Sequence, residues 1–274
     1  MVQMSTIGKD QAAGWMEKPV RLIKDMTFRR FVVRTHLVRP GERLDKTLMP
    51  YLAGLVEEND IVIVGEKIVA IAEGRAVLVK SITPRPLARY LSERVRPLGY
   101  GVGLRRPETM EMAIREVGTA RILAAAVAGA LDRIFRRTGD FYRIAGRQVT
   151  AIDGPGPTTI PPYNRYIVLA PKNPKPVIEG LAHKLGCQVA VVDVNDVGSE
   201  VLAASPGLDW GLVQELMRDN PMGQGAQGTP LAVLRPILSG PSMTTWSTLE
   251  TKEFGGGWIT PFGGEGDSDL RLSP

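Results

Sequence analysis

Short runs of branched apolar residues place the strongest constraint on how this chain folds. The run "IVIVG" at 61–65 has four consecutive aliphatic residues and follows the turn residues Asn59 and Asp60. Such a run predicts a strand that is buried on both faces. Similar runs at 166–171, 187–196 and 231–237 predict further strands. The rest of the chain must therefore supply elements that cover these strands.

Several segments have the spacing of helices. Leu44, Leu48, Leu52 and Leu55 are spaced four, four and three residues apart, which predicts one amphipathic helix over 40–56. We expect further helices at 83–95, at 107–135 with a break near Gly118, at 175–186 and at 207–219. Segment 20–38 alternates like a strand, and 139–153 reads as a hairpin. Because helices and strands mix without regular βαβ alternation, we predict an α+β fold with mixed sheets and packed helices.

The length of 274 residues suits one large domain or two small ones. We expect a flexible N-terminal arm at 1–18, one domain at 19–240 and a C-terminal tail at 241–274. The tail is rich in Gly, Ser and Thr but carries Trp246, Phe254, Trp258 and Phe262. It is either disordered or docked, on its own domain or on a protein partner.

Charge and cysteine content narrow the class of partner. The net charge of +5 favours anionic partners such as nucleotides, although the basic runs also suit solvated surfaces. Nucleic acid is a less favoured partner, since only 140–149 interleaves aromatic and basic residues. Cys187 is the single cysteine, so no disulfide forms within the chain, which fits a cytoplasmic protein; we expect it to be a small buried residue. No apolar run reaches the roughly 18 residues of a membrane span.

Asp153 and Asp193 each end an apolar run and precede turn residues. We expect both at the carboxyl ends of strands, where ligand groups gather in mixed sheets. Two carboxylates that converge can bind Mg²⁺ or Mn²⁺ against phosphate oxygens, with Asn195 or Asp196 as a further oxygen ligand. The alternative is that each aspartate makes a turn with its own backbone.

A Gly-rich segment, "NPMGQGAQGTP" at 220–230, is a second candidate site. Gly223, Gly225 and Gly228 allow backbone N–H groups to approach a phosphate, but the Lys-Ser/Thr ending of a P-loop is missing. The segment can equally be a connector. In "GEKIVAIAEGR", Lys67 and Arg75 flank an apolar stretch, and each either faces an anion or lies on the surface.

Five motifs occur in a recognisable order: "HLVRPGERLDK", "NDIVIVGEKIVAIAEGR", "AIDGPGP", "VAVVDVND" and "MGQGAQGTP". Through them the chain resembles the F420-0:γ-glutamyl ligase family from about 35 to 237. The resemblance implies an α+β ligase-like fold, an intertwined homodimer, and GTP with Mg²⁺ or Mn²⁺, and K⁺ as a monovalent cation. The implied reaction activates an acceptor carboxylate as an acyl phosphate, which the amine of glutamate attacks.

The resemblance also assigns residues. Family metal ligands fall on Asp153, Asp193 and Gln224, and nucleotide contacts on Thr35, His36, Leu37, Val38, Glu66, Lys67, Gly223, Gln224, Gly225 and Gly228. Four family positions are changed: a lysine is Ile71, a threonine is Val194, an asparagine is Gly156 and a glutamate is Gln224. Two hypotheses follow, an active ligase or a non-catalytic relative that binds a ligand or a protein partner, with the tail as its docking segment.

Overall fold

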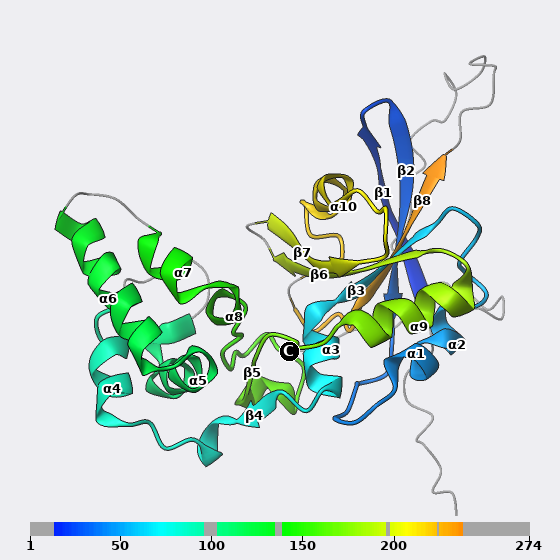
Figure 1. Ribbon diagram of the computed structural model, residues 1–274. Coiled ribbons are helices and arrows are strands. Elements are labelled where there is room, and N and C mark those ends of the chain that lie inside the picture. The colour runs from blue at the N-terminus through cyan, green and yellow to red at the C-terminus, as the bar shows by residue number, and fades with distance from the viewer. Residues whose placement is uncertain (1–13, 96–102, 135–138, 196–197, 224, 238–274) are drawn as a thin grey trace, which may run out of the picture.

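The computed structural model describes residues 14–95, 103–134, 139–195, 198–223 and 225–237. The chain forms two lobes, one built around a six-stranded sheet and the other mostly helical (Figure 1). The predicted α+β class, with a mixed sheet and packed helices, is confirmed. The tail at 241–274, Asp196 and Gln224 lie outside the described residues.

The large sheet has the strand order β1-β2-β8-β3-β6-β7. Strands β3 and β6 are parallel, and every other neighbouring pair is antiparallel. The strands are β1 (Gly14–Ile23), β2 (Met26–Arg34), β3 (Ile61–Gly65), β6 (Gln188–Asn195), β7 (Gly198–Ala204) and β8 (Leu231–Ile237). Residues 14–18, assigned above to the flexible arm, are therefore the first half of β1. The edge strand β7 was not predicted; it begins with Gly198, Ser199 and Glu200, and only its last four residues are apolar.

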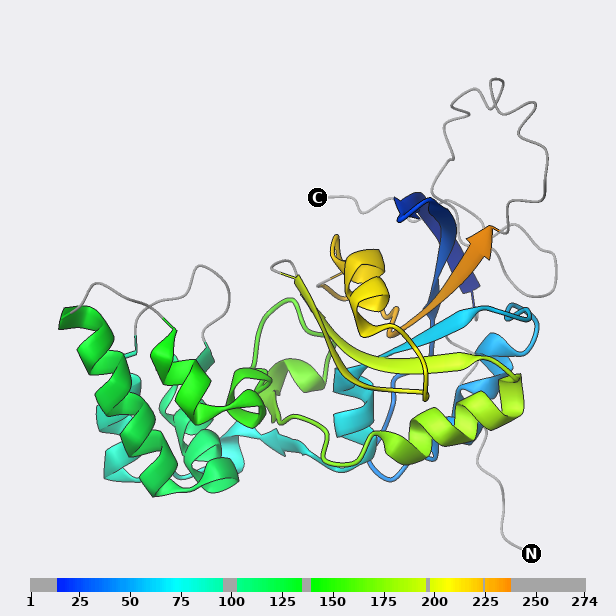
Figure 2. The same ribbon diagram turned by 45° about the horizontal axis from the view of Figure 1, so that its top comes forward.

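Both faces of the central strand β3 are buried, as predicted. Val62 and Val64 pack in one core beneath α1 (Leu44–Thr47), α2 (Met49–Leu52), α3 (Glu66–Ala72) and α9 (Lys175–Leu185). Ile61 and Ile63 pack in the opposite core with α10 (Trp210–Met217) (Figure 2). Cys187 packs against the first core and is half-buried; burial raises the pKa of its thiol to about 11.

The prediction of one continuous helix over 40–56 is wrong. Two short helices, α1 and α2, meet at Leu48, and Leu44, Leu48 and Leu52 are all buried as the spacing required. Pro50 stands in the first turn of α2. Because proline has no N–H and its ring clashes with the carbonyl four residues earlier, one regular helix through this position is unfavourable.

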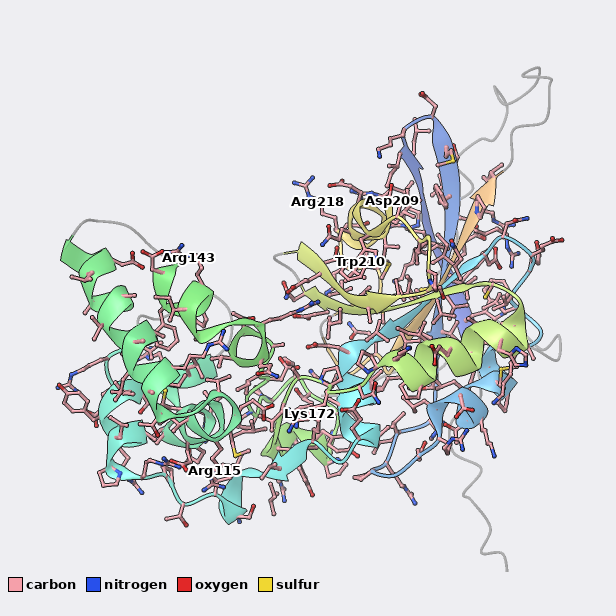
Figure 3. The ribbon with its side chains drawn as sticks, viewed as in Figure 1. Arg115, Arg143, Lys172, Asp209, Trp210 and Arg218 are labelled. Atoms are coloured by element: carbon pink, nitrogen blue, oxygen red, sulfur yellow. The ribbon has the colours of Figure 1, made fainter. Side chains whose placement is uncertain are left out.

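The helical lobe has its own apolar core. The lobe comprises the two-stranded sheet of β4 (Ala76–Leu78) and β5 (Tyr166–Val168), 3-10 turns at Val79–Ser81 and Gly103–Arg105, and the helices α4 (Pro86–Ser92), α5 (Pro107–Val117), α6 (Thr119–Ile134), α7 (Asp140–Ala145) and α8 (Arg147–Thr150). A further 3-10 turn, Tyr163–Arg165, precedes β5, and its Tyr163 packs in the first core. The predicted break at Gly118 is confirmed by its φ of +86°. On α5, buried Glu111 accepts hydrogen bonds from Arg85 and Arg115, and Figure 3 shows Arg115 at the outside of the lobe.

The hairpin predicted over 139–153 is wrong, because this segment forms α7 and α8. Gly139 and Gly146 have φ values of +105° and +88°, which end α7 on both sides. Between them, Phe141 lies against Gly129 of α6, where an added Cβ would be 3.1 Å from the Phe141 Cβ. The small residue on α6 therefore admits α7 at close range, and packing decides between helix and strand.

Arg75 joins the two lobes. Its Nη2 lies 2.7 Å from the Glu116 Oε1, and both side chains are largely buried. Its Nε also donates to the Ala170 carbonyl. Arg75 is thus neither the surface charge nor the free anion contact considered above. No helix in the described ranges has the length and apolarity to cross a bilayer.

Candidate active site

The parallel pair β3 and β6 brings two acidic residues to one edge of the sheet. The last paired residues are Gly65 and Val192, and the next residues are Glu66 and Asp193. The carboxyl ends of parallel strands meet at the same edge, which is where ligand groups collect. The prediction that Asp193 lies near the carboxyl end of a strand is confirmed.

Glycine at 65 lets the Gly-rich segment pass close to this edge. An added Cβ would lie 3.3 Å from both the Met222 Cε and the Pro230 carbonyl oxygen. The Gly65 N–H donates to that Pro230 oxygen at 2.8 Å. The beginning and end of the 222–230 segment are thereby held beside the first residues of α3.

Asp153 reaches the same place from the helical lobe. The expectation that it ends a strand is wrong: it follows α8 and makes a single bridge with Val168 of β5. The Asp153 N–H donates to the Val168 carbonyl, and the Val168 N–H donates back, both at 2.9 Å. The Asp153 Oδ2 lies 2.7 Å from the Nζ of Lys67, in the first turn of α3.

Glu66, Lys67, Asp153 and Asp193 form a cluster, here called the acidic cluster, in which the charged groups shift one another's pKa values. Burial raises the pKa of Asp193 to about 6, and the carboxylates of Asp153 and Glu200 add to the effect. Burial likewise raises the pKa of Glu66 well above its usual range, helped by Asp193 and Asp153. Burial lowers the Lys67 pKa, but the surrounding carboxylates outweigh this and leave it raised. Asp153 and Asp193 therefore interact electrostatically, as members of one cluster.

The Glu66 side chain gives the clearest indication that the cluster suits a cation. Its Oε2 is buried and has no hydrogen-bond partner among the residues that the structure describes. An orphaned buried carboxylate oxygen is costly unless a proton or a cation satisfies it. In the chain as described, no group of three or more acidic, histidine or cysteine side chains is arranged to hold a metal ion. Mg²⁺, however, usually keeps several waters and takes one or two carboxylates together with phosphate oxygens, which this cluster fits.

The raised pKa of Asp193 gives a pH dependence that can be measured on metal-free protein. Its ordinary value is 3.8 and its folded value about 6. Between these values the folded state holds more protons than the unfolded state, so the free energy of unfolding falls as pH rises. The full cost above pH 6 is about 2–3 kcal/mol. Urea unfolding in a chelator should show this fall, and Asp193→Asn should make it less steep, while the raised pKa of Glu66 leaves a remaining slope of the same sign. Equal pH slopes in the two proteins would contradict the assignment.

The Gly-rich loop is closed by its own side chains. The Gly225 N–H donates to the Gln227 Oε1 at 2.7 Å, and the Gly223 N–H donates to the Asn220 Oδ1 at 3.0 Å. Thr229 donates its hydroxyl to the Met222 carbonyl at 2.6 Å. Gly223 and Gly228 have positive φ, as a tight loop requires. The side chain of Gln227 occupies the inner side of this loop.

The Thr35–Val38 segment runs beside the loop. The Thr35 N–H donates to the Gly228 carbonyl at 3.1 Å. The His36 Nε2 lies 2.7 Å from the Glu42 Oε2, and its Nδ1 lies 3.0 Å from the Tyr51 hydroxyl. Leu37 is exposed, whereas Val38 is buried in the core beneath the sheet. Of these four positions, Val38 can offer a ligand only its backbone.

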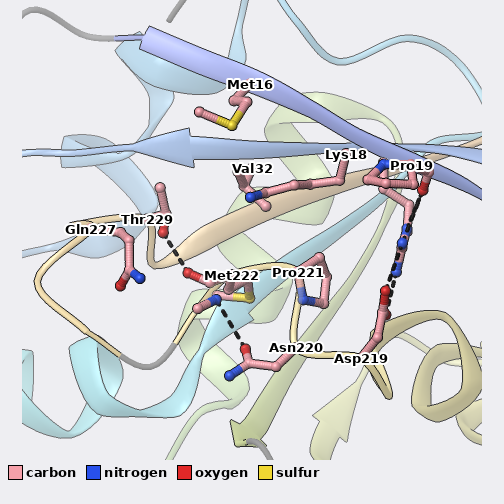
Figure 4. A pocket seen from close by; sticks show the side chains of 12 residues that line it. Met16, Lys18, Pro19, Val32, Asp219, Asn220, Pro221, Met222, Gln227 and Thr229 are labelled. Carbon is pink, nitrogen blue, oxygen red and sulfur yellow. Dashed lines mark hydrogen bonds and ion pairs between the residues drawn. The ribbon is translucent and has the colours of Figure 1, made fainter. Parts of the chain in front are cut away.

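A cavity of about 250 Å³ lies next to the loop (Figure 4). Strands β1 and β2 form one wall with Met16, Lys18 and Val32, and 219–223, Gln227 and Thr229 form the other. Arg30 at its margin is committed to structure, because its guanidinium donates to both Asp219 carboxylate oxygens. The acidic cluster is not part of this cavity.

Residues 32–208 match the F420-0:gamma-glutamyl ligase family, which is more than half of the chain. The chain belongs to this family. A comparison with curated proteins gave no match. The matched range contains Glu66, Lys67, Asp153 and Asp193, and it ends before the Gly-rich loop.

Two features of this F420-0:gamma-glutamyl ligase family member were not evident from its sequence. The first is Arg147 on α8, which pairs with Glu200 of β7 at 2.9 Å and donates a hydrogen bond to the Val201 carbonyl. The positive charge of Arg147 opposes the rise in the Glu66 pKa. It lies in a basic segment of several arginines, and nothing in the pattern distinguished it. Ile71, where the resemblance places a nucleotide-binding lysine, is buried in the core and cannot reach a phosphate.

Proposed function

We propose that this protein is a GTP-dependent ligase that joins L-glutamate to F420-0 or to a related acceptor carboxylate. Family membership supports a ligase. The observation that carries the proposal is the cluster of Glu66, Asp153 and Asp193 around Lys67, with one buried Glu66 oxygen unpartnered. Such a cluster suits a divalent cation that is shared with phosphate.

The proposed chemistry has two steps. The acceptor carboxylate attacks the γ-phosphorus of GTP, which forms an acyl phosphate and releases GDP. The amine of glutamate then attacks the acyl carbon, so that an amide bond forms, phosphate leaves and a proton passes to solvent. Positioning and charge neutralisation supply most of the rate in such transfers.

Three residues of the cluster, Asp153, Asp193 and Lys67, have a proposed role in binding. Asp153 and Asp193 hold the cation, Mg²⁺ or Mn²⁺, with Gln224 as a further oxygen ligand. When bound, the metal neutralises phosphate charge. Lys67 contacts a phosphate oxygen, and the loop from Gly223 to Gly228 surrounds the phosphates. K⁺ is a further cation to test. Because the Gly225 N–H donates to the Gln227 side chain, phosphate binding in the loop requires Gln227 to move.

The cavity beside the loop supports a nucleotide as well. Its volume of about 250 Å³ is below the range of roughly 300–1,000 Å³ that holds a whole drug-sized ligand. It therefore suits one part of a nucleotide, while the phosphates extend along the loop towards the acidic cluster.

A non-catalytic family member is the second candidate. The burial of Ile71 favours it, since the phosphate contact implied at this position is replaced by core packing. In this alternative the site binds a ligand without turnover, or the tail at 241–274 docks on a protein partner. The cluster around Lys67 persists in both candidates, so binding alone does not separate them.

Thermal unfolding with GTP or ATP, each with and without Mn²⁺, tests the proposal. A ligand at a hundred times its dissociation constant stabilises the folded state by about 2.7 kcal/mol. We expect stabilisation by GTP that requires the metal, and release of GDP and phosphate that requires both acceptor and glutamate. Stabilisation without product release would favour the non-catalytic candidate. No stabilisation by either nucleotide at millimolar concentration would refute the ligase, and sedimentation over a dilution series tests the predicted homodimer.

A further inference from the structure

An exposed apolar surface lies at the end of the large sheet, far along the strands from the acidic cluster. Leu22 of β1 is 69% exposed, Val20 is 58% exposed and Ile237, the last residue of β8, is 37% exposed. Leu22 pairs with Thr27 of β2, and Thr27 pairs with Ile237. Directly paired residues point to the same face of a sheet, so these side chains form one row across three strands.

This row lies on the same face of the sheet as the first core. It lies beyond the helices that cover that core. Further along the same face, the guanidinium groups of Arg29 and Arg235 lie 5.0 Å and 5.2 Å from the centre of the Phe31 ring. They close the core at that level. In both ribbon views the outer ends of β1, β2 and β8 extend past α1, α2 and α9 (Figures 1 and 2).

The position where the described chain ends points to what covers this surface. Strand β8 ends at Ile237 in the row itself, and 37 residues follow, from 238 to 274. Trp246 is nine residues further on, so extended chain places it within about 30 Å of Ile237. A tethered segment reaches an effective concentration in the millimolar range. We propose that residues 238–274 fold back on the face formed by Val20, Leu22, Thr27 and Ile237, with their aromatic side chains against it.

Charge and size favour this occupant over a second copy of the chain. Residues 238–274 contain five acidic and two basic residues, whereas residues 14–34 of the β1–β2 hairpin contain six basic and two acidic residues. The tail and the hairpin therefore attract each other. A stable dimer buries about 1,200–2,000 Å² in total, which is far more than three aliphatic side chains supply. This inference concerns a different surface from the proposed active site and does not depend on the ligase proposal.

Limited trypsin digestion of the full-length protein tests the docking, because Lys252 lies among the tail aromatics. We expect slow cleavage at Lys252 in the parent protein. Leu22→Glu places a charge on the docking face and should speed this cleavage about tenfold. Val127→Glu is the matched control, because Val127 on α6 is 62% exposed and lies on the other lobe. In this variant, cleavage at Lys252 should proceed at the parent rate.

A second variant keeps the test decisive if Leu22→Glu fails to fold, which circular dichroism would reveal. The combined variant Trp246→Ser, Phe254→Ser, Trp258→Ser and Phe262→Ser changes only the tail, and it should speed cleavage at Lys252 to a similar extent. Cleavage at the parent rate in both variants would overturn the proposal. Protection that disappears on dilution would also overturn it, because a second copy would then be the occupant.

Discussion

Asp193→Ala should abolish the stabilisation by GTP and Mn²⁺ while leaving the metal-free protein at least as stable as the parent. The two effects share one cause. Burial and the Asp153 carboxylate make an ionised Asp193 unfavourable in the metal-free protein, as its raised pKa of about 6 records. Asp193 is also one of the two carboxylates that are proposed to hold the cation. Removing it relieves repulsion among the acids but also removes a ligand.

Binding should weaken by about a hundredfold or more, since even an outer-shell partner of a metal ligand is worth 10–100-fold. Thermal unfolding and titration calorimetry with GTP and Mn²⁺ measure this loss. Glu179→Ala is the control, because Glu179 is an exposed carboxylate on α9 that pairs only with Lys175 in the described chain. Unchanged metal-dependent binding in Asp193→Ala would show that the site assignment is wrong. Lost binding together with lost stability would indicate a folding defect instead.

The parts of the fold that were predictable are those in which local pattern and packing agree. The run at 61–65 is aliphatic throughout, and both faces of β3 are buried. Gly118 separates two helices because its positive φ is favourable for glycine and costly for other residues. By contrast, 139–153 has residues that suit a strand, and contacts with residues distant in the sequence select helices, among them the packing of Phe141 against Gly129 on α6.

The candidate site shows the same division. The identity of Asp153 and Asp193 could be inferred from their position after apolar runs, but the route of Asp153 could not. It comes from the helical lobe and is held by a single bridge to Val168, which joins residues fifteen positions apart. Likewise, the orphaned oxygen of Glu66 is a consequence of burial, and no spacing in the sequence encodes it. Local patterns therefore predicted candidate residues, while tertiary contacts determined their electrostatics.

The turn at 57–60 offers a matched pair of substitutions that separates a buried ion pair from an exposed one. Asp60 and Glu57 both bond to Arg235 of β8. The Asp60 side chain is 0% exposed, whereas that of Glu57 is 65% exposed. The Asp60 carboxylate also accepts the Glu57 N–H at 2.8 Å. From sequence, Asp60 was only a turn residue; in the structure it is the buried anion that neutralises Arg235.

Asp60→Ala should lower the free energy of unfolding by about 3–5 kcal/mol, because it leaves the largely buried Arg235 guanidinium without its main counter-charge. Glu57→Ala should cost less than about 1 kcal/mol, since an exposed ion pair gains little over its hydrated partners. Urea unfolding at neutral pH measures both, with an unchanged m-value as the check that the unfolded state is the same. Similar losses in the two variants would mean that burial does not set the strength of this pair. In that case Arg235 would be stabilised chiefly by the Leu55 carbonyl, which its Nη2 also contacts at 2.5 Å.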